Sequence, residues 1–212
     1  MKKVFQLFSI VLVFTVLAGC GKQDFTQIEG QVLEKGSNKG VAGAKVIFSE
    51  CVAGDGVFAS AVCLDVETVI TDAQGKFVFT KESDKADRYR IRAGKDNYGK
   101  PIEVFQTANA GEKTKNINFT LPASAWIKFH VKNVNPFNEE DLIIAPGSSG
   151  LSGPYFLYGK NIDTTYMVGG GLYLGNFKNN ITWTIERQFK RKGFSDSIFC
   201  KALDTVFYEI KY

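Results

Sequence analysis

The chain has 212 residues, and its 26 Lys and Arg against 22 Asp and Glu give a formal net charge of +4. Because this balance is close and the basic residues are scattered, the composition argues against nucleic acid as a partner. The length suits a short N-terminal segment followed by two small domains of about 90 to 100 residues each.

Residues 1–19 have the three parts of a secretory signal peptide. Lys2 and Lys3 form a positive n-region, residues 4–16 form an apolar h-region, and small residues precede Cys20. This apolar run is too short for a transmembrane helix, which needs about 20 residues. We therefore expect residues 1–19 to be removed.

The residues around the expected cleavage point are Leu17, Ala18, Gly19 and Cys20. They resemble the lipobox of bacterial lipoproteins, which implies lipidation of the Cys20 thiol and acylation of the new amino group. Two or more acyl chains anchor a domain stably, because each buried methylene contributes about 0.8 kcal/mol. We expect a lipid anchor in the outer membrane or at the surface of a Gram-negative cell, with a periplasm-facing orientation as the alternative.

Residues 20–25 form a short polar tether after the expected cleavage site. Within it, Lys22, Gln23 and Asp24 resemble the surface-export signal of Bacteroidetes lipoproteins. A solvated linker is the alternative interpretation of the same three residues.

From residue 26 onward the apolar periodicity is two, which is typical of β-strands. Clusters of Gly, Asp, Asn and Pro separate the strand-like runs, and no segment indicates a helix. Short strands with regular turns predict a β-sandwich over residues 26–121. Further strands are expected at residues 66–71, 76–80, 89–93, 102–106 and 116–121. Residues 71–77 predict a turn that closes a β-hairpin, because Asp72 can accept backbone amide hydrogen bonds and Gly75 tolerates positive φ.

Three short blocks follow one another in this half: Ile28, Gly30, Val32; then Gly40, Val41, Gly43, Ala44, Val46; then Thr71, Asp72, Gly75, Phe77. In this order they resemble the carboxypeptidase regulatory-like family, a prealbumin-type β-sandwich. The resemblance covers about residues 26–121 and implies a non-catalytic scaffold or binding unit of an exported bacterial protein. The long segment 50–66 departs from the family pattern.

The cysteines fit an exported protein, in whose compartment disulfides persist. Cys51 and Cys63 flank a glycine-containing segment and predict a disulfide that staples a hairpin. Cys200 then has no partner, and we expect it to be a small buried apolar side chain. No cysteine pair has the short spacing of a metal knuckle, so we predict no metal site.

Residues 122–212 predict a second β-sandwich domain of unrecognised family, which begins at Pro122. Its first strand is expected at residues 125–134, where Ile127, Phe129 and Val131 share one face. Further strands are expected at residues 141–145, 155–158, 164–168, 181–189, 194–201 and 205–211. Basic residues between the 181–189 and 194–201 strands indicate a solvated hairpin tip, and Gly169 to Gly171 indicate a turn or bulge.

No residue pattern indicates catalysis. His130, the single histidine, lies on an exposed strand face. Residues 147–153 miss the nucleophile-elbow pattern because Pro154 stands where a glycine is needed. Residues 169–171 lack the Lys and Ser or Thr of a phosphate loop, and residues 139–141 lack the spaced ligands of a calcium loop. We expect no enzyme activity, no cofactor and no metal.

Four aromatic residues near loops are candidates for ligand binding: Phe137, Tyr155, Tyr158 and Tyr166. Exposed rings flanked by Asn and Asp can stack on sugars or grip peptides, whereas core packing is the default for aromatic residues.

Three triplets resemble the O-glycosylation motif of exported Bacteroidetes proteins and mark Thr164, Ser197 and Thr205 as candidate sites. From all these features we predict a non-catalytic, membrane-anchored surface or periplasmic binding module for glycan or protein. A structural or assembly subunit of an envelope complex is the alternative, and an enzyme comes third.

Overall fold

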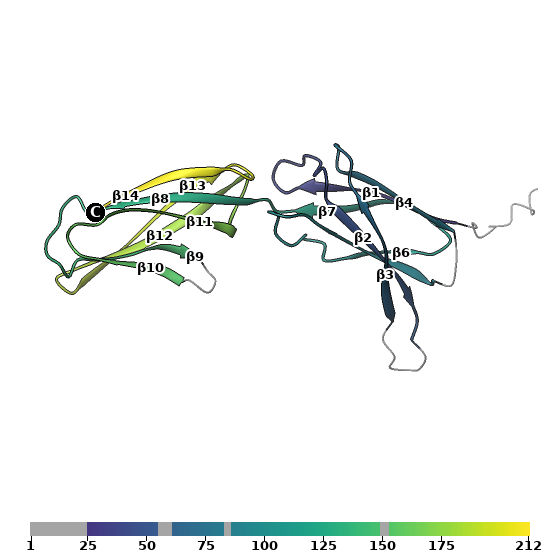
Figure 1. Ribbon diagram of the computed structural model, residues 1–212, viewed down its shortest axis with the longest axis horizontal. Helices are drawn as coiled ribbons and strands as arrows, with labels where there is room; N and C mark the ends of the chain where they lie inside the picture. Colours follow the sequence, from purple (N-terminus) through teal and green to yellow (C-terminus); the bar gives the residue numbers. More distant parts are fainter. Residues whose placement is uncertain (1–24, 55–60, 83–85, 149–152) are drawn as a thin grey trace, which may run out of the picture.

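The computed structural model describes residues 25–54, 61–82, 86–148 and 153–212. Over these residues the fold is all-β, with four sheets that make two β-sandwiches joined end to end (Figure 1). This confirms the predicted fold class. The described part of the chain contains no helix that could cross a membrane.

The first sandwich packs a three-stranded sheet, ordered β4-β1-β7, against a four-stranded sheet, ordered β3-β2-β5-β6. β1 pairs antiparallel with β4 and parallel with β7. Inward-facing residues such as Ile28, Phe48, Phe79 and Phe119 are fully buried between the sheets. The strands are β1 (Phe25–Glu34), β2 (Lys45–Val52), β3 (Val62–Ile70), β4 (Lys76–Glu82), β5 (Arg88–Gly94), β6 (Gln106–Asn109) and β7 (Lys113–Leu121).

The turn at residues 71–77 is present, but the prediction that it closes a hairpin is wrong. Oδ1 of Asp72 accepts hydrogen bonds from the amides of Gln74 at 2.9 Å and Lys76 at 2.8 Å. However, β3 pairs with β2 while β4 pairs with β1. The turn therefore carries the chain from one sheet to the other. The prediction failed because local turn chemistry does not specify which sheet receives the next strand.

Residues 102–106 are also not the predicted strand. β6 begins only at Gln106, and the preceding residues form a loop. The amide of Ile102 donates to the carbonyl of Thr120 at 3.1 Å, which holds this loop beside β7. The alternation of apolar residues at 102–105 therefore occurs in an irregular loop and not in a hydrogen-bonded strand.

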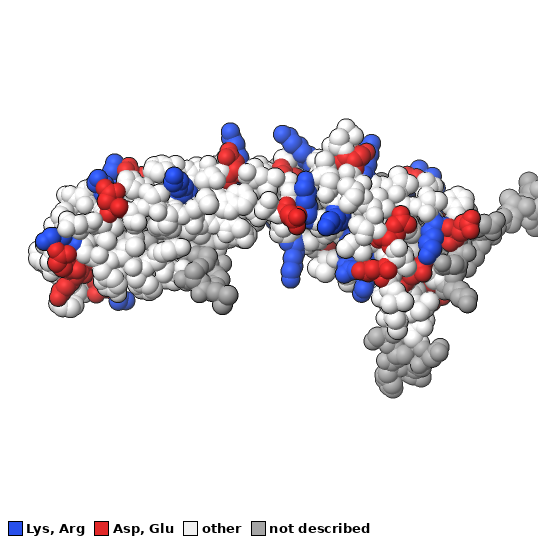
Figure 2. All heavy atoms as spheres, in the orientation of Figure 1, with Lys and Arg blue, Asp and Glu red and all other residues white. Residues whose placement is uncertain are grey.

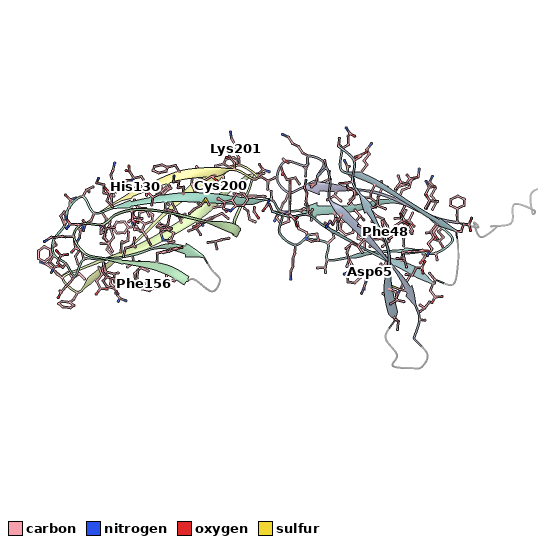
Figure 3. All side chains as sticks on the ribbon, in the orientation of Figure 1. Phe48, Asp65, His130, Phe156, Cys200 and Lys201 are labelled. Carbon is pink, nitrogen blue, oxygen red and sulfur yellow. A yellow bond between two sulfur atoms is a disulfide. The ribbon has the colours of Figure 1, made fainter. Side chains whose placement is uncertain are left out.

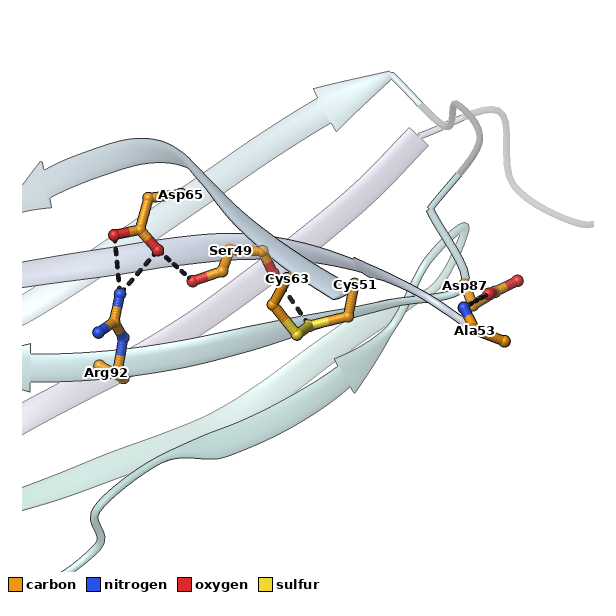
Figure 4. Close-up of a disulfide and its surroundings, with 7 residues drawn as sticks. All are labelled: Ser49, Cys51, Ala53, Cys63, Asp65, Asp87 and Arg92. Carbon is orange, nitrogen blue, oxygen red and sulfur yellow. Dashed lines mark hydrogen bonds and ion pairs between the residues drawn. A yellow bond between two sulfur atoms is a disulfide. The ribbon is translucent and has the colours of Figure 1, made fainter. Parts of the chain in front are cut away.

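The predicted disulfide joins Cys51 and Cys63, which are directly paired on β2 and β3 with their Cα atoms 4.1 Å apart (Figure 4). Beside it, the hydroxyl of Ser49 donates to Asp65 at 2.6 Å, and Nη2 of Arg92 donates to both oxygens of Asp65 at 2.7 and 2.8 Å. The hydrogen bonds from Ser49 and Arg92 lower the pKa of Asp65. The disulfide and this hydrogen-bonded group together hold β3 on the edge of its sheet.

Replacing Cys51 and Cys63 with serine is expected to lower the free energy of unfolding of the first sandwich by about 3 kcal/mol. The disulfide closes a short loop and so restricts the unfolded chain. Thermal unfolding with and without dithiothreitol measures this effect. The wild type should lose stability in reductant and the double variant should not, whereas a wild type insensitive to full reduction would contradict the prediction.

The second sandwich packs a three-stranded sheet, ordered β11-β8-β14, against a four-stranded sheet, ordered β10-β9-β12-β13. Its core includes Ile127, Phe129, Ile143 and Ile181. The glycines at 169–171 form a bulge in β11, as the sequence indicates. The strands are β8 (Ser124–Lys132), β9 (Leu142–Ser148), β10 (Gly153–Tyr158), β11 (Asp163–Leu174), β12 (Phe177–Arg187), β13 (Lys190–Cys200) and β14 (Thr205–Lys211).

The two sandwiches meet at a short junction, since β7 and β8 are separated only by Pro122 and Ala123. The carbonyl of Pro122 accepts a hydrogen bond from the amide of Gly99, and the carbonyl of Ala123 accepts one from Gly175, each at 2.8 Å. Both sandwiches thus bind the linker through the backbone, which restricts motion between them.

Side chains also cross this junction. Nδ2 of Asn176 in the second sandwich donates to Oε1 of Glu34 at 2.8 Å, while the Tyr98 hydroxyl donates to Oε2 of the same carboxylate at 3.0 Å. Burial raises the pKa of Glu34, but the hydrogen bonds that it accepts outweigh burial and lower the pKa overall. Nζ of Lys35 lies 5.4 Å from the centre of the Phe177 ring.

Candidate functional site

The outer face of the β10-β9-β12-β13 sheet carries aromatic, hydroxyl and amide side chains in its central part. Directly paired residues of neighbouring strands share a face, and the register places Phe156, Ile144 and Thr184 in one row across three strands. We call the aromatic, hydroxyl and amide residues in the central part of this surface the neutral face. It consists of the exposed Phe156, Tyr158, Asn180, Thr182, Ser195 and Ser197 and the half-buried Thr184. The exposed Phe199 lies at its end, where it is paired with Lys178.

The two aromatic residues of the neutral face lie on β10, one of the two edge strands of the sheet. Phe156 is 54% exposed and Tyr158 is 63% exposed, and they are two residues apart, so both point away from the core. In Figure 3, Phe156 lies on the side of the second sandwich opposite to His130.

The polar residues of the neutral face lie on β12 and β13. Asn180 is paired with Ser197 and Thr182 with Ser195. Their alternation with the buried Ile181 follows from the strand period of two. Within the described residues, no protein group forms a hydrogen bond with the side chains of these four residues or of Thr184.

A groove runs beside this polar row, because β9 and β12 pair at only three positions and then separate. The separation begins next to Pro146, which has no amide hydrogen to continue the ladder. The groove has a volume of about 470 Å³, and Trp183, Asn180, Thr182 and Gly147 are among the residues that line it.

Neither the neutral face nor the lining of the groove contains a charged residue. Charged residues of the same sheet surface lie at its two ends. Lys178 lies beyond Asn180 at one end, and the Glu186 to Arg191 ion pair, 2.6 Å, shares the row of Leu142 and Tyr158 at the other. Figure 2 shows charged side chains on the visible side of the second sandwich mainly toward its ends.

The structure separates the four aromatic residues predicted to bind ligand. Tyr158 lies on the neutral face, and Phe137 lies in the loop before β9, 56% exposed. Tyr155 and Tyr166 contact each other, with ring centres 4.3 Å apart, on the opposite side of β9 and β10 from Phe156. The four residues therefore do not form one cluster.

Tyr166 is part of the packing of the second sandwich. Its ring stacks on Phe129 at 5.5 Å between centres, and its hydroxyl donates to the carbonyl of Pro146 at 2.9 Å. Burial raises the pKa of Tyr166. These contacts favour the packing interpretation for Tyr166, the default for an aromatic residue in a sandwich.

Phe137 is held by a buried carboxylate. Oδ2 of Asp141 accepts hydrogen bonds from the Phe137 amide at 2.9 Å and from Nδ2 of Asn133 at 3.0 Å, and it lies 3.3 Å from Nε of Arg187. Asp141 is fully buried. It fixes the loop at the end of the second sandwich that is remote from the junction.

Sequence reasoning missed Phe156, Asn180, Thr182 and Thr184. The pattern that identifies the last three is the alternation of amide and hydroxyl residues with Ile181, Trp183 and Ile185. No alternation of polar and apolar residues identifies Phe156, because its neighbours in the chain, Pro154, Tyr155, Leu157 and Tyr158, are all aromatic or aliphatic.

His130 lies on the exposed face of β8, as predicted. Its Nε2 is 2.7 Å from Asp163 and its Nδ1 is 3.2 Å from Glu209, while Nζ of Lys132 is 2.6 Å from Asp163. Hydrogen bonds from Lys132 and His130 lower the pKa of Asp163. In the described part of the chain, no group of three or more His, Cys, Asp or Glu residues is placed to hold a metal ion.

The remaining predicted sites differ in accessibility. Ser197 and Thr205 are exposed and Thr164 is half-buried, and their O-glycosylation stays a prediction. Cys200 is a buried free cysteine (Figure 3). Cys20, the predicted lipidation site, lies outside the described residues.

No family model and no curated protein matches the chain, so its membership of the carboxypeptidase regulatory-like family stays a prediction. Solved structures with some similarity include the minor pilin GBS52 of Streptococcus agalactiae, with 11% identity over 88% of this chain and 94% of that chain and a TM-score of 0.34. They also include the shaft pilin SpaA of Lactobacillus rhamnosus GG, with 9% identity over 88% of this chain and 96% of that chain and a TM-score of 0.39.

A third similar structure is the TIE protein of Bacillus anthracis, with 12% identity over 88% of this chain and a TM-score of 0.38. The chain spans only 34% of that protein, and it spans 62% of a streptococcal ancillary pilin. At these identities and TM-scores, the similarity carries no conclusion about function.

Proposed function

We propose that the protein is a non-catalytic, lipid-anchored envelope protein whose second sandwich presents the neutral face to a ligand. The observation that carries this proposal is the neutral face itself, where five polar side chains without hydrogen-bond partners among the described residues lie beside two exposed aromatic rings and a groove. Exposed aromatic rings beside polar side chains that are free to bond to a partner are typical of binding surfaces.

The fold supports presentation of this face away from a membrane. β1 begins at the end of the first sandwich remote from the junction and reaches the junction at Glu34 (Figure 1). The tether and the lipid at Cys20 would then hold the first sandwich near the bilayer, and the junction would direct the second sandwich outward.

A structural or assembly subunit is the second candidate function, and the junction favours it. Backbone hydrogen bonds to Pro122 and Ala123, with the contact of Asn176 and Glu34, make the two sandwiches a rod with little freedom between its halves. Such a rod can space other components of an envelope complex.

A photo-crosslinking amino acid in place of Thr182 is expected to form an adduct when intact cells are irradiated. The matched control places the same amino acid at Phe207, which is 57% exposed on β14 in the opposite sheet. An adduct at Thr182 and not at Phe207 supports a ligand on the neutral face. No adduct at Thr182 would contradict the binding proposal, and adducts only at Phe207 would favour assembly through the other sheet.

A further inference from the structure

We infer that the neutral face binds an uncharged polysaccharide. This inference rests on the proposed function and names the chemical class of its ligand. Three properties of the face carry it: exposed aromatic rings, free hydroxyl and amide groups, and a centre without charged side chains.

The exposed rings suit the apolar side of a sugar. A pyranose presents C–H bonds on its faces and hydroxyl groups around its rim, so it needs an apolar plane beneath it and hydrogen-bonding groups at its edge. Phe156 and Tyr158 supply that plane on one side of β10, about 7 Å apart along the strand. Tyr158 adds a hydroxyl that can donate or accept.

The polar row suits the sugar rim. A hydroxyl of Thr182, Thr184, Ser195 or Ser197 both donates and accepts a hydrogen bond, and so does the amide of Asn180. Sugar hydroxyls have the same dual character. Because these side chains have no partners within the described residues, binding would not break existing hydrogen bonds of the protein.

Charge complementarity excludes the main competing polymers. Nucleic acid and acidic polysaccharides require Lys or Arg close to each anionic group. The centre of this face has neither, and Arg191 at its end is paired with Glu186. A folded protein partner usually meets an apolar interface centre, whereas amide and hydroxyl groups occupy the centre here.

The groove extends the site into the sheet. Its volume of about 470 Å³ is within the range of about 300–1,000 Å³ that is typical of ligand sites. Trp183 and Pro146 give it apolar walls, while Asn180 and Thr182 stand at its edge. A branch or a bend of a neutral glycan chain fits this combination.

Affinity electrophoresis of the full mature protein in detergent micelles tests the inference. The gels contain neutral polysaccharides (galactomannan, dextran, amylopectin and arabinan) or the anionic polygalacturonate and heparin. We expect at least one neutral polysaccharide and neither anionic one to retard the protein. No retardation by any neutral polysaccharide, or retardation by the anionic ones alone, would overturn the inference.

Three variants locate the binding. The double variant Phe156→Ala, Tyr158→Ala and the single variant Thr182→Asp should each weaken binding of the retarding polysaccharide at least about tenfold. Phe207→Ala removes an equally exposed aromatic residue from the opposite sheet and should leave binding unchanged. Binding that is unchanged in the first two variants, with unaltered thermal unfolding, would show that the neutral face is not the site.

The outcomes separate this inference from the proposed function. A protein adduct at Thr182 on cells, without retardation by any neutral polysaccharide, would overturn the glycan ligand and leave the binding function standing. The absence of both the adduct and the retardation would overturn both.

Discussion

Asp141→Ala is expected to lower the free energy of unfolding of the second sandwich by about 3–5 kcal/mol. The substitution leaves the guanidinium of Arg187, the amide of Phe137 and the side chain of Asn133 without the carboxylate that they share. Removing one partner of a buried ion pair costs about this amount. Asp141 is fully buried, and the buried Nε of the half-buried Arg187 would lose its carboxylate partner. The effect should exceed that of any surface substitution in this domain.

Urea denaturation followed by tryptophan fluorescence measures this loss selectively. Both tryptophans, Trp126 and Trp183, belong to the second sandwich. Glu140→Ala is the matched control, because Glu140 is an exposed acid next to Asp141 and should change stability by no more than about 0.5 kcal/mol. A loss below about 1 kcal/mol for Asp141→Ala would contradict the role assigned to this carboxylate.

The same carboxylate predicts how stability depends on pH. Burial raises the pKa of Asp141, but hydrogen bonds from Phe137 and Asn133 and the charge of Arg187 outweigh burial, so the folded pKa lies below its usual range. The unfolded state therefore binds the proton more readily. The stabilisation is fully present above the unfolded pKa, near 4, and is lost as the pH falls through the folded pKa. The free energy of unfolding of the Asp141→Ala variant should therefore fall less than that of the wild type as the pH is lowered through this range.

Local features were predictable where a few neighbouring residues decide the structure. The period of two predicted strands, Asp72 and Gly75 predicted a turn, and the spacing of Cys51 and Cys63 predicted the disulfide. Each of these depends on residues close in the chain.

Features that depend on which strands become neighbours could not be predicted. The turn at residues 71–77 gives no information on whether β4 joins the sheet of β3 or the facing sheet. Tyr155 and Phe156 are consecutive aromatic residues, and only the register with β9 decides which one points outward. The groove depends on where β9 leaves β12, two strands about 40 residues apart in the chain.

Gly30→Ala is expected to cost the first sandwich about 3 kcal/mol, at the upper end for overpacking, because its backbone neighbour cannot move aside. A Cβ atom at Gly30 would overlap the carbonyl oxygen of Ile117 on β7 and lie 2.6 Å from the ring of Phe77 on β4. β1 is the central strand between these two, so the substitution strains both pairings. This close approach gives a physical reason for glycine in the first of the three blocks that resemble a known family.

Calorimetry of the full mature protein measures this cost, with Gly94→Ala as the matched control in the same sandwich. A Cβ atom at Gly94 would meet no atom within 4 Å, so the control should unfold like the wild type. Tryptophan fluorescence should show a second sandwich of nearly wild-type stability in both variants, because both tryptophans lie beyond the junction. Equal unfolding temperatures for Gly30→Ala and Gly94→Ala would contradict this prediction. They would show that β1 and β7 can move apart to admit a Cβ atom without loss of stability, so the close parallel pairing would not require glycine at residue 30.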